Sequence, residues 1–258
     1  MHALVTGASA GIGEAVVREL ARRRMDVTLV ARRKDVLDRV AGELPTKSHV
    51  IARDLSDPSC AEGILAEAEA ALGPIDVLVS NAGFMTLGAV ATFDHDEADR
   101  LIAINFLTPM RLLRAALPRM IARGKGTVVN VTSIAAFVTM PDWAYQSASK
   151  TASAVFSEAL KTELRGTGVH SLTVYPGLND TEMNRSGLES YGGPSLMTKV
   201  MPVGRPNAFA TIICDAIEKK KTRVIYPRFY WLVRWFPRIS QWLSERFGPR
   251  LRDHRSAR

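Results

Sequence analysis

The chain has only two cysteines, Cys60 and Cys214, and nothing around either has metal-ligand spacing. A disulfide framework and a metal centre are therefore not expected, and both thiols are interpreted as reduced packing residues. The sequence also lacks a run of about 18 uninterrupted apolar residues, so no membrane-spanning helix is predicted. Its first residues enter an apolar segment directly, without the pattern of a secretory signal. These absences indicate a cytoplasmic protein.

The C-terminal segment combines many arginines with few acidic residues. The formal net charge is +8, yet residues 228–258 hold eight arginines against Glu245 and Asp253. The basic character therefore belongs to this tail, and the rest of the chain is close to neutral. Because no recognised nucleic-acid module accompanies the charge, nucleic acid is not expected as a partner.

Apolar runs alternate with amphipathic segments almost to the end of the chain. This alternation predicts a doubly wound parallel sheet of the Rossmann type in a single α/β domain, covering residues 1–227, with 228–258 as an amphipathic extension. The predicted strands are 3–5, 27–30, 49–52, 76–79, 127–131, 171–175 and 223–226. The predicted helices are 14–21, 35–44, 59–72, 94–122, 143–166 and 207–221. Residues 184–206 are predicted to form a loop that acts as a mobile substrate lid.

A glycine-rich turn, Thr6–Gly13, separates the first strand from the first helix. Glycines at 7, 11 and 13 permit a tight turn and close approach of a ligand to the backbone. The helix N-terminus behind them favours an anion such as pyrophosphate. The spacing is G-x-x-x-G-x-G, and taken alone it also fits a tight turn without a ligand.

Arg32 and Arg33 follow the second predicted strand, with Lys34 next and no carboxylate among them. In a dinucleotide-binding fold this position faces the adenosine ribose, where arginine suits a 2′-phosphate and an acidic residue suits a hydroxyl. The pattern favours NADP(H) over NAD(H). The other interpretation is a solvated basic helix start.

Taken together, the motifs resemble the short-chain dehydrogenase/reductase family over residues 3–227. The matching segments are Thr6–Gly13, Asp54-Leu55, Ser80–Gly83, Asn105, Ser133, Ser147–Lys150, and Pro176-Gly177 with Thr181. The resemblance implies that Gly7, Ser9, Ala10, Gly11, Ile12 and Gly13 hold the pyrophosphate. It places Asp54 and Leu55 at the adenine, Asn81, Ala82 and Gly83 at the adenine ribose, Lys150 at the nicotinamide ribose, and Pro176, Gly177 and Thr181 at the nicotinamide. It also implies a homodimer or homotetramer.

The resemblance further implies catalysis by Asn105, Ser133, Lys150 and a tyrosine four residues before the lysine. Here that position is Gln146, and the distance from Ser133 identifies the same residue. A glutamine can hydrogen-bond a carbonyl oxygen but has no proton to give at neutral pH. The adjacent Tyr145 would point about 100° away around the helix. Asn105, in mid-helix, must either satisfy backbone groups at a kink or order water.

The sequence leaves three interpretations of Gln146 open. The chain could be an engineered variant of a tyrosine enzyme, or a native enzyme with altered or slower chemistry. Alternatively, it is a catalytically silent NADP-binding protein that serves as a sensor or scaffold. Because Ser133, Lys150 and Asn105 are retained, we favour an oxidoreductase that interconverts a hydrophobic ketone and a secondary alcohol.

The extension carries an apolar and aromatic stripe with interspersed arginines. Its apolar members are Leu232, Trp235, Phe236, Ile239, Trp242, Leu243 and Phe247, and Pro237 interrupts it. One interpretation is a helix docked on its own domain or on a subunit partner. The other is an interfacial helix at 229–247 that contacts anionic lipid.

Overall fold

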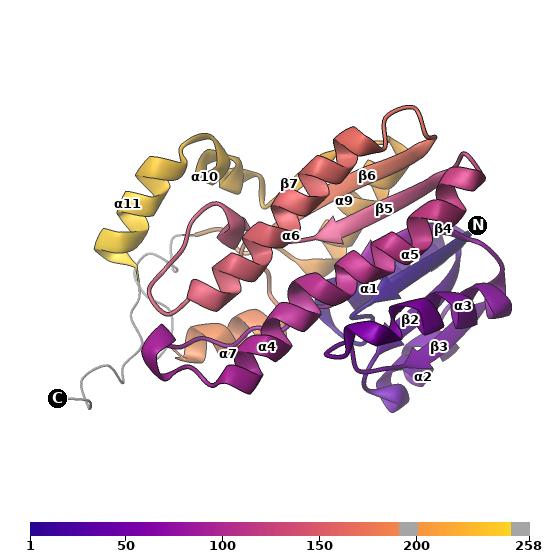
Figure 1. Cartoon of the computed structure of the whole chain (residues 1–258), viewed down its shortest axis with the longest axis horizontal. Helices are drawn as coiled ribbons and strands as arrows, with labels where there is room; N and C mark the ends of the chain where they lie inside the picture. The colour runs from indigo at the N-terminus through magenta and orange to yellow at the C-terminus, as the bar shows by residue number, and fades with distance from the viewer. Residues whose placement is uncertain (191–200, 249–258) are drawn as a thin grey trace.

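The computed structural model describes residues 1–190 and 201–248 and contains one seven-stranded parallel sheet (Figure 1). The strand order is β3-β2-β1-β4-β5-β6-β7. The strands are β1 (His2–Thr6), β2 (Asp26–Ala31), β3 (Ser48–Ala52), β4 (Ile75–Ser80), β5 (Gly126–Val131), β6 (Val169–Pro176) and β7 (Arg223–Tyr226). The order reverses between β1 and β4, so the crevice beyond their carboxyl ends is the expected ligand site. The predicted fold class and all seven predicted strands are confirmed.

Helices cover both faces of the sheet because alternate strand residues point to opposite sides. Ala3 and Val5 pack with α1 (Gly11–Arg22), α2 (Lys34–Gly42) and α9 (Pro206–Glu218) on one face. Leu4 lies among residues of α3 (Ala61–Leu72), α5 (Thr108–Ala122) and α6 (Ala144–Glu163) on the other. Both free cysteines pack as expected: Cys214 is buried and Cys60 partly buried.

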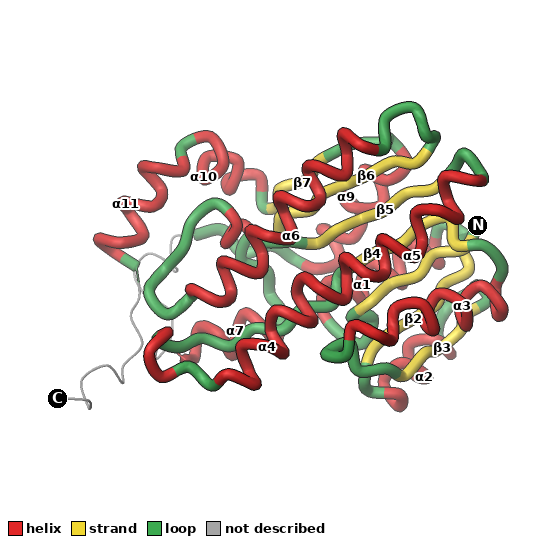
Figure 2. Tube along the Cα trace, in the orientation of Figure 1, coloured by secondary structure: helices red, strands yellow, loops and turns green. Residues whose placement is uncertain are grey.

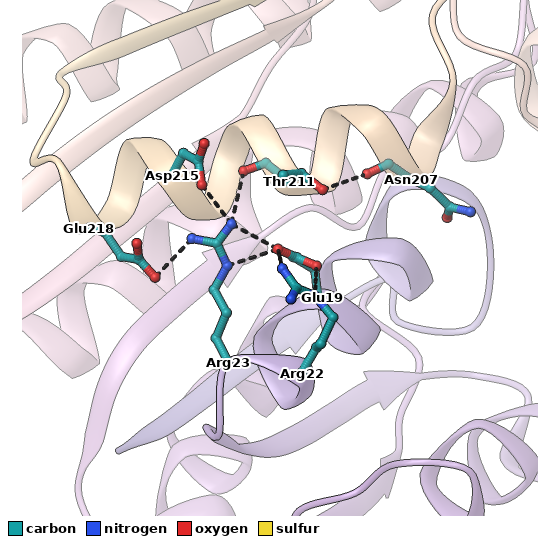
Figure 3. A network of polar contacts seen from close by, with 7 residues as sticks. All are labelled: Glu19, Arg22, Arg23, Asn207, Thr211, Asp215 and Glu218. Carbon is teal, nitrogen blue, oxygen red and sulfur yellow. Dashed lines mark hydrogen bonds and ion pairs between the residues drawn. The ribbon is translucent and has the colours of Figure 1, made fainter.

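Helices α1 and α9 are also joined by charge (Figure 3). The guanidinium of Arg23, which follows α1, lies 2.8 Å from Glu19, 2.6 Å from Asp215 and 2.8 Å from Glu218. A second arginine, Arg22, pairs with Glu19 at 2.7 Å. Because Arg23 is largely shielded from solvent and contacts three carboxylates, it fixes the angle between the two helices more firmly than an exposed pair would.

One continuous helical stretch, His95–Ala122, consists of α4 (His95–Ile102), a π-helical turn (Ala103–Leu107) and α5. Among the described residues it is the one helix whose length and apolar composition would suffice to cross a membrane, but half of its most apolar window is buried inside the fold. It therefore fits the description of a core helix better than that of a membrane span. The prediction of a helix over 94–122 is confirmed.

The prediction of a loop over 184–206 is partly wrong, because α7 occupies Glu182–Ser190. Thr181 precedes the helix, and its Oγ1 accepts a hydrogen bond from the Asn184 N–H over 3.4 Å, as an N-cap residue does. The Thr181-Glu182 pair was therefore an available helix-start signal that the prediction did not use. Residues 201–205 are irregular, and 191–200 lie outside the described residues.

The last two helices of the described residues are α10 (Trp231–Trp235) and α11 (Pro237–Phe247), separated at Phe236. Both lie at the end of the sheet where α4 and α7 are found, as do the loops that follow β4, β5 and β6 (Figure 2). Tyr230, just before α10, is completely buried, and its hydroxyl donates to the Pro202 carbonyl over 3.2 Å. The C-terminal helices are thus anchored to the domain at their base.

Candidate active site

A cleft of about 720 Å³ lies across the carboxyl ends of the central strands. Most of the residues singled out in the sequence line it. They are Gly7, Ser9, Ala10, Gly11, Ile12, Arg32, Arg33, Asp54, Leu55, Asn81, Ala82, Gly83, Ser133, Gln146, Lys150, Pro176, Gly177 and Thr181. Two others, Gly13 and Asn105, lie just behind the lining. Seven separate segments of the sequence therefore meet in one place.

The glycine turn fits closely against the end of β4. A Cβ on Gly7, whose φ is +68°, would lie 2.8 Å from the Ala82 Cα, and one on Gly13 would lie 2.1 Å from the Gly7 carbonyl oxygen. The Thr6 hydroxyl fixes this approach by accepting hydrogen bonds from the backbone N–H groups of Asn81 and Ala82, each over 3.0 Å. Glycine is required here by the packing of loop on strand, whether or not a ligand is bound.

The N-terminus of α1 is open toward the cleft. Its N-cap residue, Ala10, makes no side-chain capping hydrogen bond, so the first-turn N–H groups are left for another acceptor. Ser9, Gly11 and Ile12 line the cleft at the same point. An uncapped helix start flanked by glycine is a suitable site for a phosphate or pyrophosphate.

Basic residues lie at the outer end of the same cleft. The Arg33 Nη2 is 3.4 Å from both the carbonyl oxygen and the hydroxyl of Ser9, and Arg32 is exposed beside it. Asp54 accepts a hydrogen bond from the Ser56 N–H over 2.9 Å and lies 3.6 Å from the Arg100 guanidinium. The cleft thus offers cationic groups to an anion on one side and a carboxylate on the other.

Asn105 sits in the π-helical turn and is almost completely buried. Its Oδ1 accepts from the Phe84 N–H over 2.8 Å, while its Nδ2 donates to the Phe84 carbonyl over 2.9 Å. Asn105 therefore satisfies the backbone of the segment that leaves β4, which is one of the two roles the sequence left open. The same Nδ2 also reaches Ser149 Oγ at 3.1 Å.

The hydrogen bonds of Asn105 set the orientation of Gln146. Because the Asn105 Oδ1 must face the Phe84 N–H, the Asn105 Nδ2 is the atom that meets Gln146. The Gln146 atom opposite this donor must be an acceptor, so it is Oε1, at 3.2 Å. The Nε2 group of Gln146 is then the part of this side chain that can donate to a ligand. Gln146 presents a hydrogen-bond donor to the cleft but no acidic proton.

Lys150 lies one helical turn after Gln146 and is deeply buried. Its Nζ would be 3.4 Å from a Cβ built on Gly83, which places the ammonium group against the backbone of the strand-end motif. Burial lowers the pKa of Lys150 to about 8, because the protein interior disfavours the charged form. The group can therefore exchange a proton near neutral pH.

Tyr145 lies apart from these groups. Its ring packs against the Phe93 ring, tilted by 35° with the centroids 4.7 Å apart, and it is not among the described residues that line the cleft. Ser133 lines the cleft, and its hydroxyl oxygen accepts from the Ala135 N–H over 3.1 Å at the start of a short helical turn. The site thus contains the lysine, serine and asparagine that the resemblance implies, with glutamine in the tyrosine position.

Sequence reasoning missed most of the apolar wall of the cleft. Its members are Phe84, Met85, Leu87, Ile104 and Trp143, joined by Met183 from α7. Phe84 and Met85 directly follow the Asn81–Gly83 motif, so their position in the chain was an available signal. Leu87 lies in the same segment, whereas Ile104, Trp143 and Met183 come from three separate segments that no local pattern connects.

The parallel sheet and the glycine cradle define a dinucleotide-binding fold, and comparison with known proteins identifies the family. The family model for short chain dehydrogenases matches residues 1–191. A short chain dehydrogenase of Pseudocercospora fijiensis is 36% identical over 187 residues, covering 70% of this chain and 60% of the relative. A glycine betaine reductase of Emericella nidulans is 35% identical over 201 residues, covering 75% of this chain and 16% of the relative. The chain thus spans less than two thirds of the length of either relative.

Solved structures resemble the whole fold. A short-chain dehydrogenase from Streptomyces avermitilis has a TM-score of 0.80 at 30% identity, covering 94% of each chain. A short-chain dehydrogenase from Sphingobium yanoikuyae in complex with NADPH has a TM-score of 0.77 at 28% identity, covering 91% of this chain and 90% of the other. A bulky-bulky ketone specific alcohol dehydrogenase from Comamonas testosteroni has a TM-score of 0.74 at 26% identity, covering 98% of each. The chain belongs to the short-chain dehydrogenase/reductase family.

Proposed function

We propose that the chain is an NADP(H)-dependent oxidoreductase that interconverts a hydrophobic ketone and a secondary alcohol. The observation that carries this proposal is the convergence of Lys150, Ser133 and Gln146 on the cleft that also contains the open start of α1. Such a cleft can hold a dinucleotide along the strand ends and a second small molecule beside its reactive ring.

The residues present fit the coenzyme. The turn has no room for a Cβ at Gly7 or Gly13, and the uncapped first turn of α1 supplies N–H donors for a pyrophosphate. Arg32 and Arg33 provide the charge that a 2′-phosphate needs, and the Sphingobium neighbour was solved with NADPH. When bound, the nicotinamide would supply or accept the hydride.

The apolar wall of the cleft supports a hydrophobic substrate. Phe84, Met85, Trp143 and Met183 offer aromatic and thioether surface, and the ketone-specific neighbour from Comamonas has the same fold. We assign steroid, polyketide, terpenoid and fatty-acyl skeletons to the same class, because apolar walls of this kind do not discriminate among them. We further propose that the protein is cytoplasmic and forms a homodimer or a homotetramer.

The proton must take a different route from the one the family's tyrosine provides. Ser133 and the Gln146 Nε2 hold the substrate oxygen by hydrogen bonds, while the Lys150 ammonium releases the proton to it through water held near Asn105. The lowered pKa of Lys150 suits this role. Without a direct acid the reaction is expected to be slow, since loss of a general acid costs about 10²–10⁴-fold.

One observation favours a second function, a catalytically silent NADP-binding sensor or scaffold. The amide of Gln146 is held by Asn105, so the position where the family carries its acid is filled by a fixed neutral group. Such a protein would bind NADPH without turnover.

Calorimetric titration with NADPH, together with turnover on a panel of ketones of increasing size, tests both proposals. We expect NADPH binding and measurable reduction of the apolar ketones. Binding without turnover, even in a Gln146→Tyr variant, would favour the silent protein. Absence of NADPH binding would refute both.

A further inference from the structure

The C-terminal helices display their apolar side chains to solvent. Trp235 is 70% exposed, and Ile239 and Trp242 are each 57% exposed. Together with five neighbours in the sequence they make a set of exposed apolar side chains on the C-terminal segment, which we call the aromatic face. Its members are Phe229, Leu232, Trp235, Phe236, Ile239, Trp242, Leu243 and Phe247, all exposed. The extension is docked on the domain through Tyr230 and Ser244, but this docking leaves the predicted apolar stripe exposed.

Helix α11 is oriented with its polar side toward the protein. Ser244 is buried, and its hydroxyl donates to the Thr139 carbonyl over 2.8 Å. Gln241 Oε1 accepts from the Thr139 N–H over 3.0 Å. In a helix on the surface of a protein surrounded by water, the apolar stripe is expected to face the core. Here the stripe at 239, 242, 243 and 247 faces outward, while specific hydrogen bonds hold the polar side inward.

The aromatic face is bordered by positive charge. Residues 228–247 contain Arg228, Arg234, Arg238 and Arg246 against the single acidic residue Glu245. Within the described part of the chain, none of the four arginines forms an ion pair with a carboxylate, and Arg234 and Arg246 lie over the rings of Phe137 and Phe247. Aromatic and aliphatic side chains interleaved with arginine are suited to the interface of a bilayer with anionic headgroups.

A second copy of the chain is a less favourable occupant. In a two-fold interface the same patch meets itself, so the four arginines around the face would approach the four arginines of the other copy with only one glutamate, Glu245, on each side to offset them. An anionic lipid surface supplies the missing negative charge. The charge around the face therefore selects lipid over self-association.

The aromatic face is connected to the entrance of the cleft. Thr139, which α11 holds, belongs to the segment between β5 and α6, and the Ser147 hydroxyl donates to Thr139 Oγ1 over 3.0 Å. Trp143, in the same segment, lines the cleft. At the base of the extension, Tyr230 packs so closely on Gly177 that a Cβ there would lie 2.2 Å from its ring. A surface that contacts the aromatic face would therefore lie beside the cleft.

We propose that the aromatic face docks the protein on the interfacial region of an anionic bilayer and holds the cleft next to the membrane. The proposal concerns a second surface and does not depend on the chemistry performed in the cleft. The contact is peripheral: α10 and α11 would lie in the plane of the interface with their apolar side chains inserted.

Flotation of the full chain with vesicles provides the test. We expect it to float with phosphatidylcholine vesicles that contain phosphatidylserine, less with phosphatidylcholine alone, and less again as salt is raised. Replacing both tryptophans, Trp235→Ser with Trp242→Ser, should weaken binding at least about tenfold because two large apolar groups are lost. Removing two charges, Arg238→Gln with Arg246→Gln, should weaken binding about tenfold on the anionic vesicles only.

Matched controls come from the opposite end of the sheet. Ile121→Ser removes an exposed apolar side chain and Arg165→Gln an exposed charge, and both should float like the unaltered protein. NADPH titration of every variant confirms that the cleft is intact. Flotation with neither vesicle, or unchanged flotation of the tryptophan variant, would overturn the proposal. It would equally be overturned if the tryptophan variant lost molecular mass in sedimentation equilibrium while vesicle binding stayed the same, since the face would then join two copies.

Discussion

The side-chain amide of Asn105 donates a hydrogen bond to Gln146 Oε1 over 3.2 Å, and this contact joins the π-helical turn to helix α6. It gives the glutamine one fixed orientation, with its own amide hydrogens left for other acceptors. A tyrosine at 146 has no acceptor in the same place but would bring an ionisable hydroxyl within one helical turn of Lys150. The difference between the two side chains leads to the first prediction.

Gln146→Tyr should raise the rate of ketone reduction with NADPH at least about tenfold, because it restores a general acid worth about 10²–10⁴-fold. The rate should acquire a pH dependence set by the new tyrosine and Lys150. Steady-state kinetics over a range of pH measures both effects. Tyr145→Phe is the matched control and should leave the rate unchanged, since this ring packs against Phe93 outside the cleft. An equal response of the two variants would contradict the assignment.

Lys150→Met should stabilise the ligand-free protein at neutral pH while abolishing turnover. Burial lowers the pKa of Lys150 from 10.5 to about 8. The charged form of this side chain therefore destabilises the folded state relative to the unfolded state. This cost is fully present below pH 8 and disappears as the pH rises to about 10.5. The gain at pH 7 should be on the order of 3 kcal/mol at most. Urea unfolding at several pH values measures it.

In the same experiment the exposed Lys221→Met serves as a control and should show no pH-dependent gain. If the Lys150→Met protein were less stable than the unaltered chain at pH 7, favourable contacts of the ammonium in the folded state would outweigh the cost of burying it.

Replacing both Arg32 and Arg33 by alanine should weaken NADPH binding at least about tenfold, because a hydrogen bond to a charged group contributes about 1.5–3 kcal/mol. NADH, which lacks the 2′-phosphate, should bind nearly as before. Fluorescence titration with the two coenzymes gives the ratio. Lys34→Ala is the control, since its ammonium is paired with Asp38 at 2.7 Å. Equal losses for both coenzymes would place the arginines away from the 2′ position.

Glu158→Gln should destabilise the protein at neutral pH and not in strong acid. Burial alone would raise the pKa of Glu158, but the hydrogen bonds from Arg223 and Lys161 outweigh it and hold the pKa at about 2. The carboxylate therefore contributes stability that is complete above pH 4.5 and is lost as the pH falls toward 2. We expect a difference of about 1–2 kcal/mol at pH 7, after allowance for solvent screening. Thermal unfolding at pH 7 and pH 2 tests this.

The exposed Glu163→Gln on the same helix is the matched control for Glu158 and should change little at either pH. A constant destabilisation by Glu158→Gln at all pH values would indicate that shape, and not charge, is responsible.

The sheet and the position of the cleft were predictable because strand periodicity is local and parallel strands place their carboxyl ends together. Each of the seven strands and the glycine turn could be recognised from its own residues. The start of α7 was missed although Thr181 and Glu182 carry the signal of a helix start, because Gly192, Gly193 and Pro194 further along the segment are typical of a loop. The roles assigned to the individual site residues remain predictions.

The orientation of side chains in the site could not be read from the sequence. Gln146 is positioned through Asn105 and the backbone of Phe84, three segments that meet only in the folded chain. The outward direction of the aromatic stripe was equally hidden. Its helical periodicity is the same whether the stripe faces the core or the solvent, and only the bonds to Thr139 decide between them.

The π-helical turn makes the site dependent on the number of residues in the chain as well as on their identity. A π turn accommodates one more residue than an α turn, so loss of any single residue from Ala103–Leu107 would let α4 and α5 wind as one regular helix. The helical segments on either side would keep about the same relative orientation, because the π turn takes up its extra residue without rotating the residues that flank it. Within the turn itself the backbone would tighten, so Asn105, where it was not the residue lost, would no longer be held in the position from which it meets both Phe84 and Gln146. A one-codon deletion there is accordingly a more damaging change than most substitutions.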